Sequence, residues 1–222
     1  MMNNLSQLEN GILATKKDLE HLEKKENSKI LVISDSHGAA EILLEIVKNF
    51  GSQVNAIIFA GDGIFDLFYV IEKAKNHISV AKWLPPVIAF AKGNNDPASF
   101  LTDSEKKIIV PQKVTLKAGN RTILVSHGHS EGVYYDFSTL EATAKVYGAN
   151  AVVFGHTHVP TEFPGTTYIM NPGSISSPRH RSFPSFAILE IAKKYINSIF
   201  YRIEYNQQLK FIPYHPESFY GF

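Results

Sequence analysis

The chain has 222 residues, of which 44% are hydrophobic and 19% charged, so it has enough apolar side chains for a buried core and too few charges for a disordered chain. Its 22 Lys and Arg residues balance 21 Asp and Glu residues, and the net charge of +1 excludes a molecule-wide field that attracts nucleic acid or an anionic membrane. The absence of cysteine excludes disulfides, thiolate nucleophiles and iron–sulfur clusters, and leaves His, Asp, Glu and Asn as candidate metal ligands.

The first residues carry no targeting signal. The chain opens with MMNNLSQLENG, which is polar, whereas a secretory signal needs a basic start and an apolar run of roughly 7–15 residues. Later apolar runs, such as 54–60 and 87–91, are far shorter than the about 20 residues that span a bilayer. We therefore expect a cytoplasmic protein that does not enter a membrane.

An amphipathic helix is predicted near the N-terminus. Its apolar residues follow heptad spacing, and they are Leu5, Leu8, Ile12, Leu19 and Leu22. Gly11 weakens this helix by roughly 1 kcal/mol relative to Ala. The helix either packs on its own domain or serves as a dimerisation arm, so residues 1–28 are expected to be a helical extension through which a homo-oligomer can form.

From residue 29 onward, short apolar runs rich in Val, Ile and Phe each end in a polar cluster with Gly, Asp or His. These runs are KILVISDSHG, NAIIFAGDG, PVIAFAKGNND, RTILVSHGHS and AVVFGHTHVP. Helices are predicted over 39–50, over 65–75 and over 138–147, the first ending at Gly51 and the third before Gly148. The first half of the chain is therefore predicted to be βαβαβ.

After Pro97 the pattern changes to paired strands. KIIVPQKVTL and RTILVSH form a predicted hairpin around the turn at 118–120. TTYIMNPGS, SFAILEI and NSIFYRIEY follow, the last two joined near 193–194. We expect one α/β domain over 29–205, with two sheets inside and helices outside, and an extended aromatic tail over 206–222.

Unusual polar residues stand directly after these predicted strands. Five of the nine histidines lie there with four acidic or amide residues: His37, His127, His129, His156, His158, Asp35, Asp62, Asn94 and Asp96. In open α/β sheets ligands bind at the carboxyl ends of strands, and carboxylate, amide and imidazole groups are ligands for divalent cations. Asp62 can bridge two metals through its two carboxylate oxygens. Each motif alone is an ordinary turn sequence, but the whole set predicts a metal site.

Six short motifs occur in a fixed order along the chain. They are Asp35-Ser36-His37, Gly61-Asp62, GNND at 93–96, SHGH at 126–129, GHTH at 155–158 and NPGS at 171–174. This set resembles the calcineurin-like metallophosphoesterases, and is most similar to their small bacterial and archaeal phosphodiesterases. The resemblance covers 29–205 and implies a four-layer αββα sandwich of two mixed β-sheets flanked by helices.

The resemblance also implies a dinuclear centre. One divalent metal would be held by Asp35, His37, Asp62 and His158, and the second by Asp62, Asn94, His127 and His156. Manganese is the metal expected first, with iron, nickel or zinc as alternatives. A hydroxide that bridges the two metals would then attack the phosphorus of the ester.

Four further residues are expected near the phosphate. Asn95 stands where many family members have His, and Asn cannot donate a proton with a useful pKa, so the general acid is unassigned. Asn95 and His129 would hydrogen-bond a phosphate oxygen. Asp96 would orient a metal ligand. Arg179 either binds the phosphate with its guanidinium group or lies in a solvated loop.

These residues lead to one favoured function and two alternatives. The favoured function is a metal-dependent phosphodiesterase that acts on a small or nucleotide-like phosphate ester. The first alternative is a catalytically weak binding scaffold, because the resemblance extends to a eukaryotic retromer subunit that keeps the fold for protein contacts. The second is a nuclease, which is disfavoured because the basic residues form no stripe for a nucleic-acid backbone.

Overall fold

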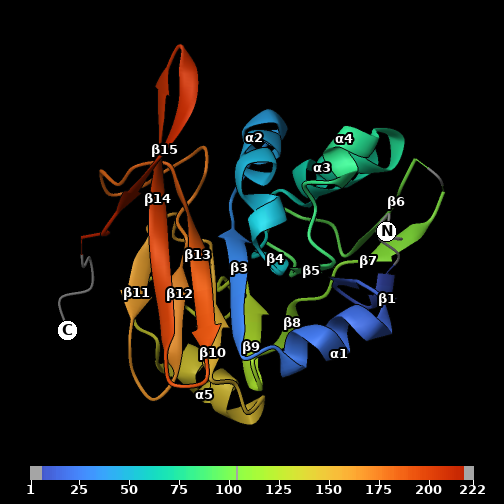
Figure 1. Ribbon diagram of the computed structural model, residues 1–222. Helices are drawn as coiled ribbons and strands as arrows, with labels where there is room; N and C mark the ends of the chain where they lie inside the picture. The colour runs from blue at the N-terminus through green and yellow to red at the C-terminus, as the bar shows by residue number, and fades with distance from the viewer. Residues whose placement is uncertain (1–6, 104, 218–222) are drawn as a thin grey trace.

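Two β-sheets lie face to face at the centre of the molecule and helices cover their outer faces (Figure 1). The structure, a computed structural model, describes residues 7–103 and 105–217. Among these residues, no helix combines the length and the apolar character needed to cross a bilayer. The four-layer α/β sandwich predicted from the sequence is confirmed.

The larger sheet has eight strands and the smaller has five. The larger sheet has the order β1 (Gln7–Glu9), β2 (Ile12–Leu13), β5 (Val87–Phe90), β4 (Ala56–Phe59), β3 (Asn27–Ile33), β13 (Ser185–Ala192), β14 (Ile196–Asn206) and β15 (Gln208–Tyr214). The smaller has the order β11 (Thr161–Phe163), β12 (Tyr168–Asn171), β10 (Ala151–Val153), β9 (Arg121–Ser126) and β8 (Lys113–Ala118). A separate pair consists of β6 (Ser99–Leu101) and β7 (Lys107–Ile109). Both large sheets are mixed, because parallel β3–β4–β5 and β9–β10–β12 are flanked by antiparallel strands.

The side-chain alternation of β3 shows how one strand contributes to two cores. Ile30 and Val32 point to the space between the sheets, where they join Val125 of β9 and Val153 of β10. Leu31 and Ile33, which alternate with them, point to the opposite face, because successive side chains of a strand point to opposite sides. A strand buried on both faces reads as a continuous apolar run, which explains the sequence KILVI.

Helices close both outer faces of the sandwich. On the larger sheet they are α2 (Ala40–Phe50), α3 (Ile64–Asn76) and α4 (Ile78–Ala81), with a 3-10 turn at Gly51–Gln53, and on the smaller sheet α5 (Ser138–Val146). Helix α1 (Lys16–Lys24) instead contacts β8 and places Leu22 in the core between the sheets. Leu43 and Ile46 of α2 and Leu67 of α3 pack on the larger sheet. Leu140 and Ala144 of α5 pack on the smaller one. The helices predicted over 39–50, 65–75 and 138–147 are thus confirmed, as is the βαβαβ order of the first half.

Two predictions about the strands need correction. The run KIIVPQKVTL is not one strand, because β7 ends at Ile109 and only β8 pairs with β9. Pro111 lies between them, and a proline has no N–H to donate to a ladder. The expected tail is also partly a strand, since 208–214 pair with β14 as β15, and the sheet continues past the predicted domain boundary at 205.

The single N-terminal helix predicted over Leu5–Leu22 is wrong. Residues 7–13 instead form the β1–β2 hairpin, and β2 extends the larger sheet by pairing with β5. Helix α1 begins only at Lys16, after Thr15 caps it by accepting the backbone N–H of Asp18 at 3.1 Å. Leu22 is buried within the chain, so the apolar face packs on its own domain, the first of the two alternatives. Leu5 lies outside the described residues.

Gly11 explains why the helix does not start earlier. Its φ of +83° is a left-handed conformation, and an added Cβ would lie 2.6 Å from Pro111 Cγ and 2.7 Å from the Phe90 carbonyl oxygen. The heptad spacing predicts a helix, but the glycine turn and the pairing with β5 outweigh that local preference. The N-terminal segment is therefore an integral part of the sheet.

We expect Gly11→Ala to lower the free energy of unfolding by about 2–3 kcal/mol, because it adds backbone strain to a contact with a main-chain atom. Gly148→Ala is the matched control, since Gly148 has a φ of +60° but nothing within 4 Å of an added Cβ. That change should cost about 1 kcal/mol. Urea unfolding of both variants measures the difference. Equal losses would contradict the docking of residues 7–13 against β5.

Candidate metal centre

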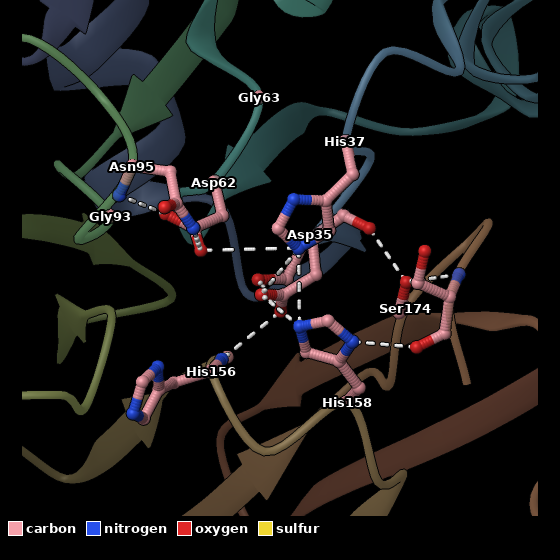
Figure 2. A network of polar contacts seen from close by, with 12 residues as sticks. Asp35, His37, Asp62, Gly63, Gly93, Asn95, His156, His158 and Ser174 are labelled. Carbon is pink, nitrogen blue, oxygen red and sulfur yellow. Dashed lines mark hydrogen bonds and ion pairs between the residues drawn. The ribbon is translucent and has the colours of Figure 1, made fainter. Parts of the chain in front are cut away.

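The predicted site residues lie in five loops that follow strands. Asp35 and His37 follow β3, Asp62 follows β4, and residues 94–96 follow β5. The histidine pair at 127 and 129 follows β9, and the pair at 156 and 158 follows β10. Because these strands are parallel within each sheet and the sheets face each other, the loops meet at one edge of the sandwich (Figures 1 and 2).

One group of possible metal ligands consists of Asp35, His37 and His158. The Nε2 atom of His158 lies 3.2 Å from Asp35 Oδ1 and 3.1 Å from Nε2 of His37. The Nε2 atom of His37 lies 3.8 Å from the same Asp35 oxygen. Two imidazole nitrogens and a carboxylate oxygen thus converge on one point, as Figure 2 shows.

A second group consists of Asp35, Asp62 and His127, so Asp35 belongs to both groups. The Nε2 atom of His127 lies 3.4 Å from Asp62 Oδ2 and 3.8 Å from Asp35 Oδ1. Asp62 Oδ2 also lies 3.9 Å from Nε2 of His37. Asp35 and Asp62 therefore each lie close to histidine nitrogens of both groups, so the two groups form one continuous cluster.

The donor atoms of this cluster fit a divalent cation. Asp35 Oδ1 and His127 Nε2 are buried and have no hydrogen-bond partner in the part of the chain that the structure describes. The Nδ1 atoms of His127 and His158 each lie 2.6 Å from a backbone carbonyl oxygen, that of Ala60 and Ser177 respectively. A carbonyl only accepts, so Nδ1 carries the proton and the Nε2 lone pair points into the cluster, which is the usual support of a metal-ligating histidine.

Burial and charge act against each other at the Asp62–His127 pair. Burial raises the pKa of Asp62, but the His127 imidazole at 3.4 Å and the hydrogen bonds from Asn95 outweigh burial and hold that pKa below its ordinary value. Burial lowers the pKa of His127, but Asp62 and Asp35 outweigh it and raise that pKa. In this electrostatic environment a positive charge between the two carboxylates is stabilised.

Five of the predicted ligands have a left-handed backbone, with φ between 43° and 66°. They are Asp35, His37, Asp62, His156 and His158. This conformation is uncommon for residues other than glycine and costs of order 1–3 kcal/mol each, so it persists only where the surroundings impose it. Here the Asp35 N–H donates to the Gly61 carbonyl at 2.9 Å, and the His37 N–H to the Asp62 carbonyl at 3.2 Å. Strain of this kind clusters at functional sites, and no motif in the sequence reveals it.

Asp96 positions the loop of Asp62 and does not itself enter the cluster. Its carboxylate accepts the backbone N–H groups of Asp62, Gly63, Ile64 and Gly93 at 2.8–2.9 Å. Ile64 is the first residue of α3, so the same carboxylate satisfies the start of that helix.

The two asparagines after Gly93 have different surroundings. Asn95 donates from its backbone N–H to Asp62 Oδ1 at 2.8 Å and from its side-chain amide to Asp62 Oδ2 at 2.6 Å (Figure 2). Asn94, the expected ligand, and Asn95 are both exposed residues. An added Cβ on Gly93 would lie 2.0 Å from Asp62 Oδ1, so glycine lets this loop approach the carboxylate. The structure brings Asn95, not Asn94, into contact with Asp62.

His156 and His129 border the second group. The ring centroid of His127 lies 5.2 Å from that of His156 and 5.5 Å from that of His129. Figure 2 shows the His156 ring turned away from Asp35, although its backbone N–H donates to Asp35 Oδ2 at 3.1 Å. Burial, followed by the charge of His127, lowers the pKa of His156 to about 4 and also lowers the pKa of His129. Both imidazoles are therefore neutral at pH 7 and can act as ligands or hydrogen-bond partners.

Tyr134 lies beside His156 and Arg179, and no pattern in the sequence points to it. Its hydroxyl donates to the His156 carbonyl at 3.0 Å and accepts a hydrogen bond from the exposed Arg179 guanidinium group. The Arg179 backbone N–H donates to the His158 carbonyl at 3.3 Å. These contacts place the exposed Arg179 next to Tyr134 and His158.

Two overlapping donor groups at one edge of a four-layer sandwich define a metal-binding α/β protein. Residues 29–194 match the family model of the calcineurin-like phosphoesterase superfamily domain. The match covers well over half of the chain, and the protein therefore belongs to the calcineurin-like phosphoesterase superfamily.

Relatives support this assignment. The probable metallophosphoesterase YsnB of Bacillus subtilis is 34% identical over 163 residues, which cover 73% of this chain and 83% of YsnB. The crystal structure of a predicted phosphoesterase from Streptococcus pneumoniae is 26% identical, with a TM-score of 0.61, and the alignment covers 86% of this chain and 99% of that one.

More distant solved structures share the fold. An archaeal phosphodiesterase is 22% identical, with a TM-score of 0.55 and coverage of 78% of this chain and 99% of that one. Vps29 from Cryptosporidium parvum is 19% identical, with a TM-score of 0.64 and coverage of 86% and 98%.

Proposed function

We propose that this protein is a phosphodiesterase that uses two divalent cations to hydrolyse a small, nucleotide-like phosphate ester. The observation that carries the proposal is the buried cluster around Asp35, in which two unpartnered donor atoms, Asp35 Oδ1 and His127 Nε2, face each other at 3.8 Å. Such an arrangement costs free energy unless a cation binds the donors.

The proposed ligands fall into two sets that share Asp62. One cation is assigned to Asp35, His37, Asp62 and His158, and the other to Asp62, Asn94, His127 and His156. When bound, the cations supply positive charge that activates water and stabilises the charge on the phosphoryl oxygens in the transition state. Carboxylate, amide and imidazole ligands suit manganese, and also iron, nickel and zinc, so manganese is proposed first.

The residues around the cluster would bind and orient the ester. Arg179 is assigned to a phosphoryl oxygen, because a guanidinium group pairs well with phosphate and Tyr134 holds it on the rim. His129 is assigned to a second oxygen, since its Nδ1 atom is buried without a partner among the described residues. Asn95 and Asp96 keep Asp62 in place, so we assign them to positioning and not to contact with the ester.

Two finer points of the function stay predictions: that the substrate is a phosphodiester, and that the protein is cytoplasmic. The archaeal phosphodiesterase that shares the fold supports a diester. The nearly neutral charge disfavours a nucleic-acid polymer, and the absence of cysteine fits the cytoplasm. The predicted homo-oligomer through the N-terminal helix lacks support, because Leu22 of that helix is buried within its own chain.

The test is hydrolysis of bis-p-nitrophenyl phosphate by protein stripped with EDTA and then given Mn²⁺. We expect activity to disappear with EDTA and to return with about two Mn²⁺ per chain. p-Nitrophenyl phosphate, the matching monoester, should be hydrolysed at least tenfold more slowly. If the folded protein turns over neither ester with Mn²⁺, Fe²⁺, Ni²⁺ or Zn²⁺, the proposal fails and a binding scaffold, the alternative with the same fold, becomes the better account.

A further inference from the structure

A cavity of about 620 Å³ lies beside the metal cluster and is not used by the function proposed above. It opens between the loop 180–183, Arg202 of β14 and the residues at the end of β15, beginning with Tyr214. Its volume falls within the range of small-molecule sites, about 300–1,000 Å³.

The residues that line this cavity are linked to the metal cluster through the chain. Val159 and Pro160, which line the cavity, directly follow His158. The loop before 180 contacts the same histidine, because Ser177 accepts from His158 Nδ1 at 2.6 Å and the Arg179 N–H donates to the His158 carbonyl at 3.3 Å. Arg179, assigned above to a phosphoryl oxygen, directly precedes His180, which lines the cavity.

Aromatic side chains give the cavity a surface for stacking. The guanidinium carbon of Arg202 lies 4.9 Å from the ring centroid of Phe183, and the Phe183 and Tyr214 rings meet edge to face at 6.2 Å. Phe183 is nonetheless 44% exposed, which is unusual for a phenylalanine that lines a cavity. Exposed aromatic rings beside arginine are a feature of sites that bind nucleobases.

The charges around the cavity favour an anion. Arg181, Arg202, His180 and His215 line it with a single carboxylate, that of Glu217. Arg202 pairs with Glu204 at 2.8 Å, whereas Arg181 has no ion pair with any carboxylate in the described ranges. Residues 180 and 181 both have positive φ, 54° and 62°, and this strained turn places their side chains at the cavity.

We propose that this cavity binds the nucleoside part of a nucleotide diester, with the base stacked on Phe183 and a second, non-scissile phosphate group of the nucleotide beside Arg181. The inference rests on the proposed function, which places the scissile phosphate at the metal cluster. Stacking on an aromatic ring is tolerant of base identity, so the cavity selects for a nucleotide and not for one base.

The test is binding of adenosine 5′-monophosphate to the full chain in EDTA, measured by isothermal titration calorimetry. We expect Phe183→Ala and Arg181→Gln each to weaken binding at least tenfold. Tyr195→Ala and Arg121→Gln are the matched controls, because they also remove an aromatic ring and a guanidinium group. Both residues contact Ala192, at the end of β13 far from the cavity. These two variants should bind like the wild type.

The outcomes separate this inference from the function it rests on. Three results would each overturn the inference, whatever the activity with Mn²⁺. The Phe183→Ala protein could bind the nucleotide as tightly as the wild type, the control variants could lose as much affinity, or the wild type could fail to bind the nucleotide at 10 mM. The protein could instead bind the nucleotide through Phe183 and Arg181 but hydrolyse no ester. That result would support a nucleotide site in the cavity and contradict the proposed phosphodiesterase activity. With an active enzyme, the Phe183→Ala change should raise KM for a nucleotide diester and leave that for methyl p-nitrophenyl phosphate unchanged.

Discussion

We expect Asp35→Asn to lower kcat/KM for bis-p-nitrophenyl phosphate by about 10³-fold or more, the loss expected when transition-state charge loses its electrostatic support. Asp35 is a proposed ligand of the first cation, and among the described residues it also belongs to the donor group that contains Asp62 and His127. Its replacement therefore removes a ligand from one cation and a carboxylate that lies beside the other. Metal content after dialysis against Mn²⁺ should fall with the activity. This is the largest effect that we predict for a single substitution.

The same variant should fold as well as the wild type in EDTA. Asp35 Oδ2 accepts from the Ser34 hydroxyl at 2.6 Å and from the His156 N–H at 3.1 Å, and an amide oxygen can accept both. The substitution also removes a fully buried charge next to a second carboxylate. Asp136→Asn, at an exposed position, is the control for activity. An Asp35→Asn enzyme with normal turnover would contradict the assignment of the metal centre.

Asp96→Ala should cost both stability and metal affinity. The change leaves four backbone N–H groups without their acceptor, and unsatisfied buried donors make a loss of about 3–4 kcal/mol reasonable. Because the loop of Asp62 is then free to move, Mn²⁺ affinity should fall by about 10–100-fold, as it does when the support of a ligand is removed. Urea unfolding in EDTA and Mn²⁺ titration measure the two effects separately.

Two further variants distinguish positioning from a general loss of stability. Asp96→Asn keeps an acceptor oxygen and should recover part of both losses. Asp136→Ala removes a comparable contact at the start of α5, where Asp136 accepts the Ser138 N–H at 2.8 Å, and should leave Mn²⁺ affinity unchanged. If Asp96→Ala loses stability but binds Mn²⁺ as tightly as the wild type, Asp96 serves only the helix.

The fold and most of the site were readable from the sequence because their signals are local. An apolar run such as KILVI must be buried on both faces, and the polar residues after it must then lie at the sheet edge. The ordered motifs carry the family resemblance, and that resemblance implied the sandwich of two mixed sheets. Asp35, His37, Asp62, His127 and His158 accordingly converge in the structure.

Features that depend on long-range contacts were not readable. The N-terminal residues have helical spacing, but Ile12 and Leu13 pair with β5, about eighty positions away in the chain, which no local pattern shows. Tyr134 belongs to no motif and is identified only by its contacts with His156 and Arg179. The difference between Asn94 and Asn95 is a matter of loop geometry, which two identical side chains cannot reveal.

The left-handed backbone of the ligand loops affects how this sandwich can change during evolution. At each of these aspartates and histidines, a replacement by glycine would relieve backbone strain as it removes a ligand. The two cores lie away from these loops and are untouched by such changes. A lineage that no longer needs the chemistry can therefore lose its ligands and keep the fold, and the remaining surface is free to evolve other contacts.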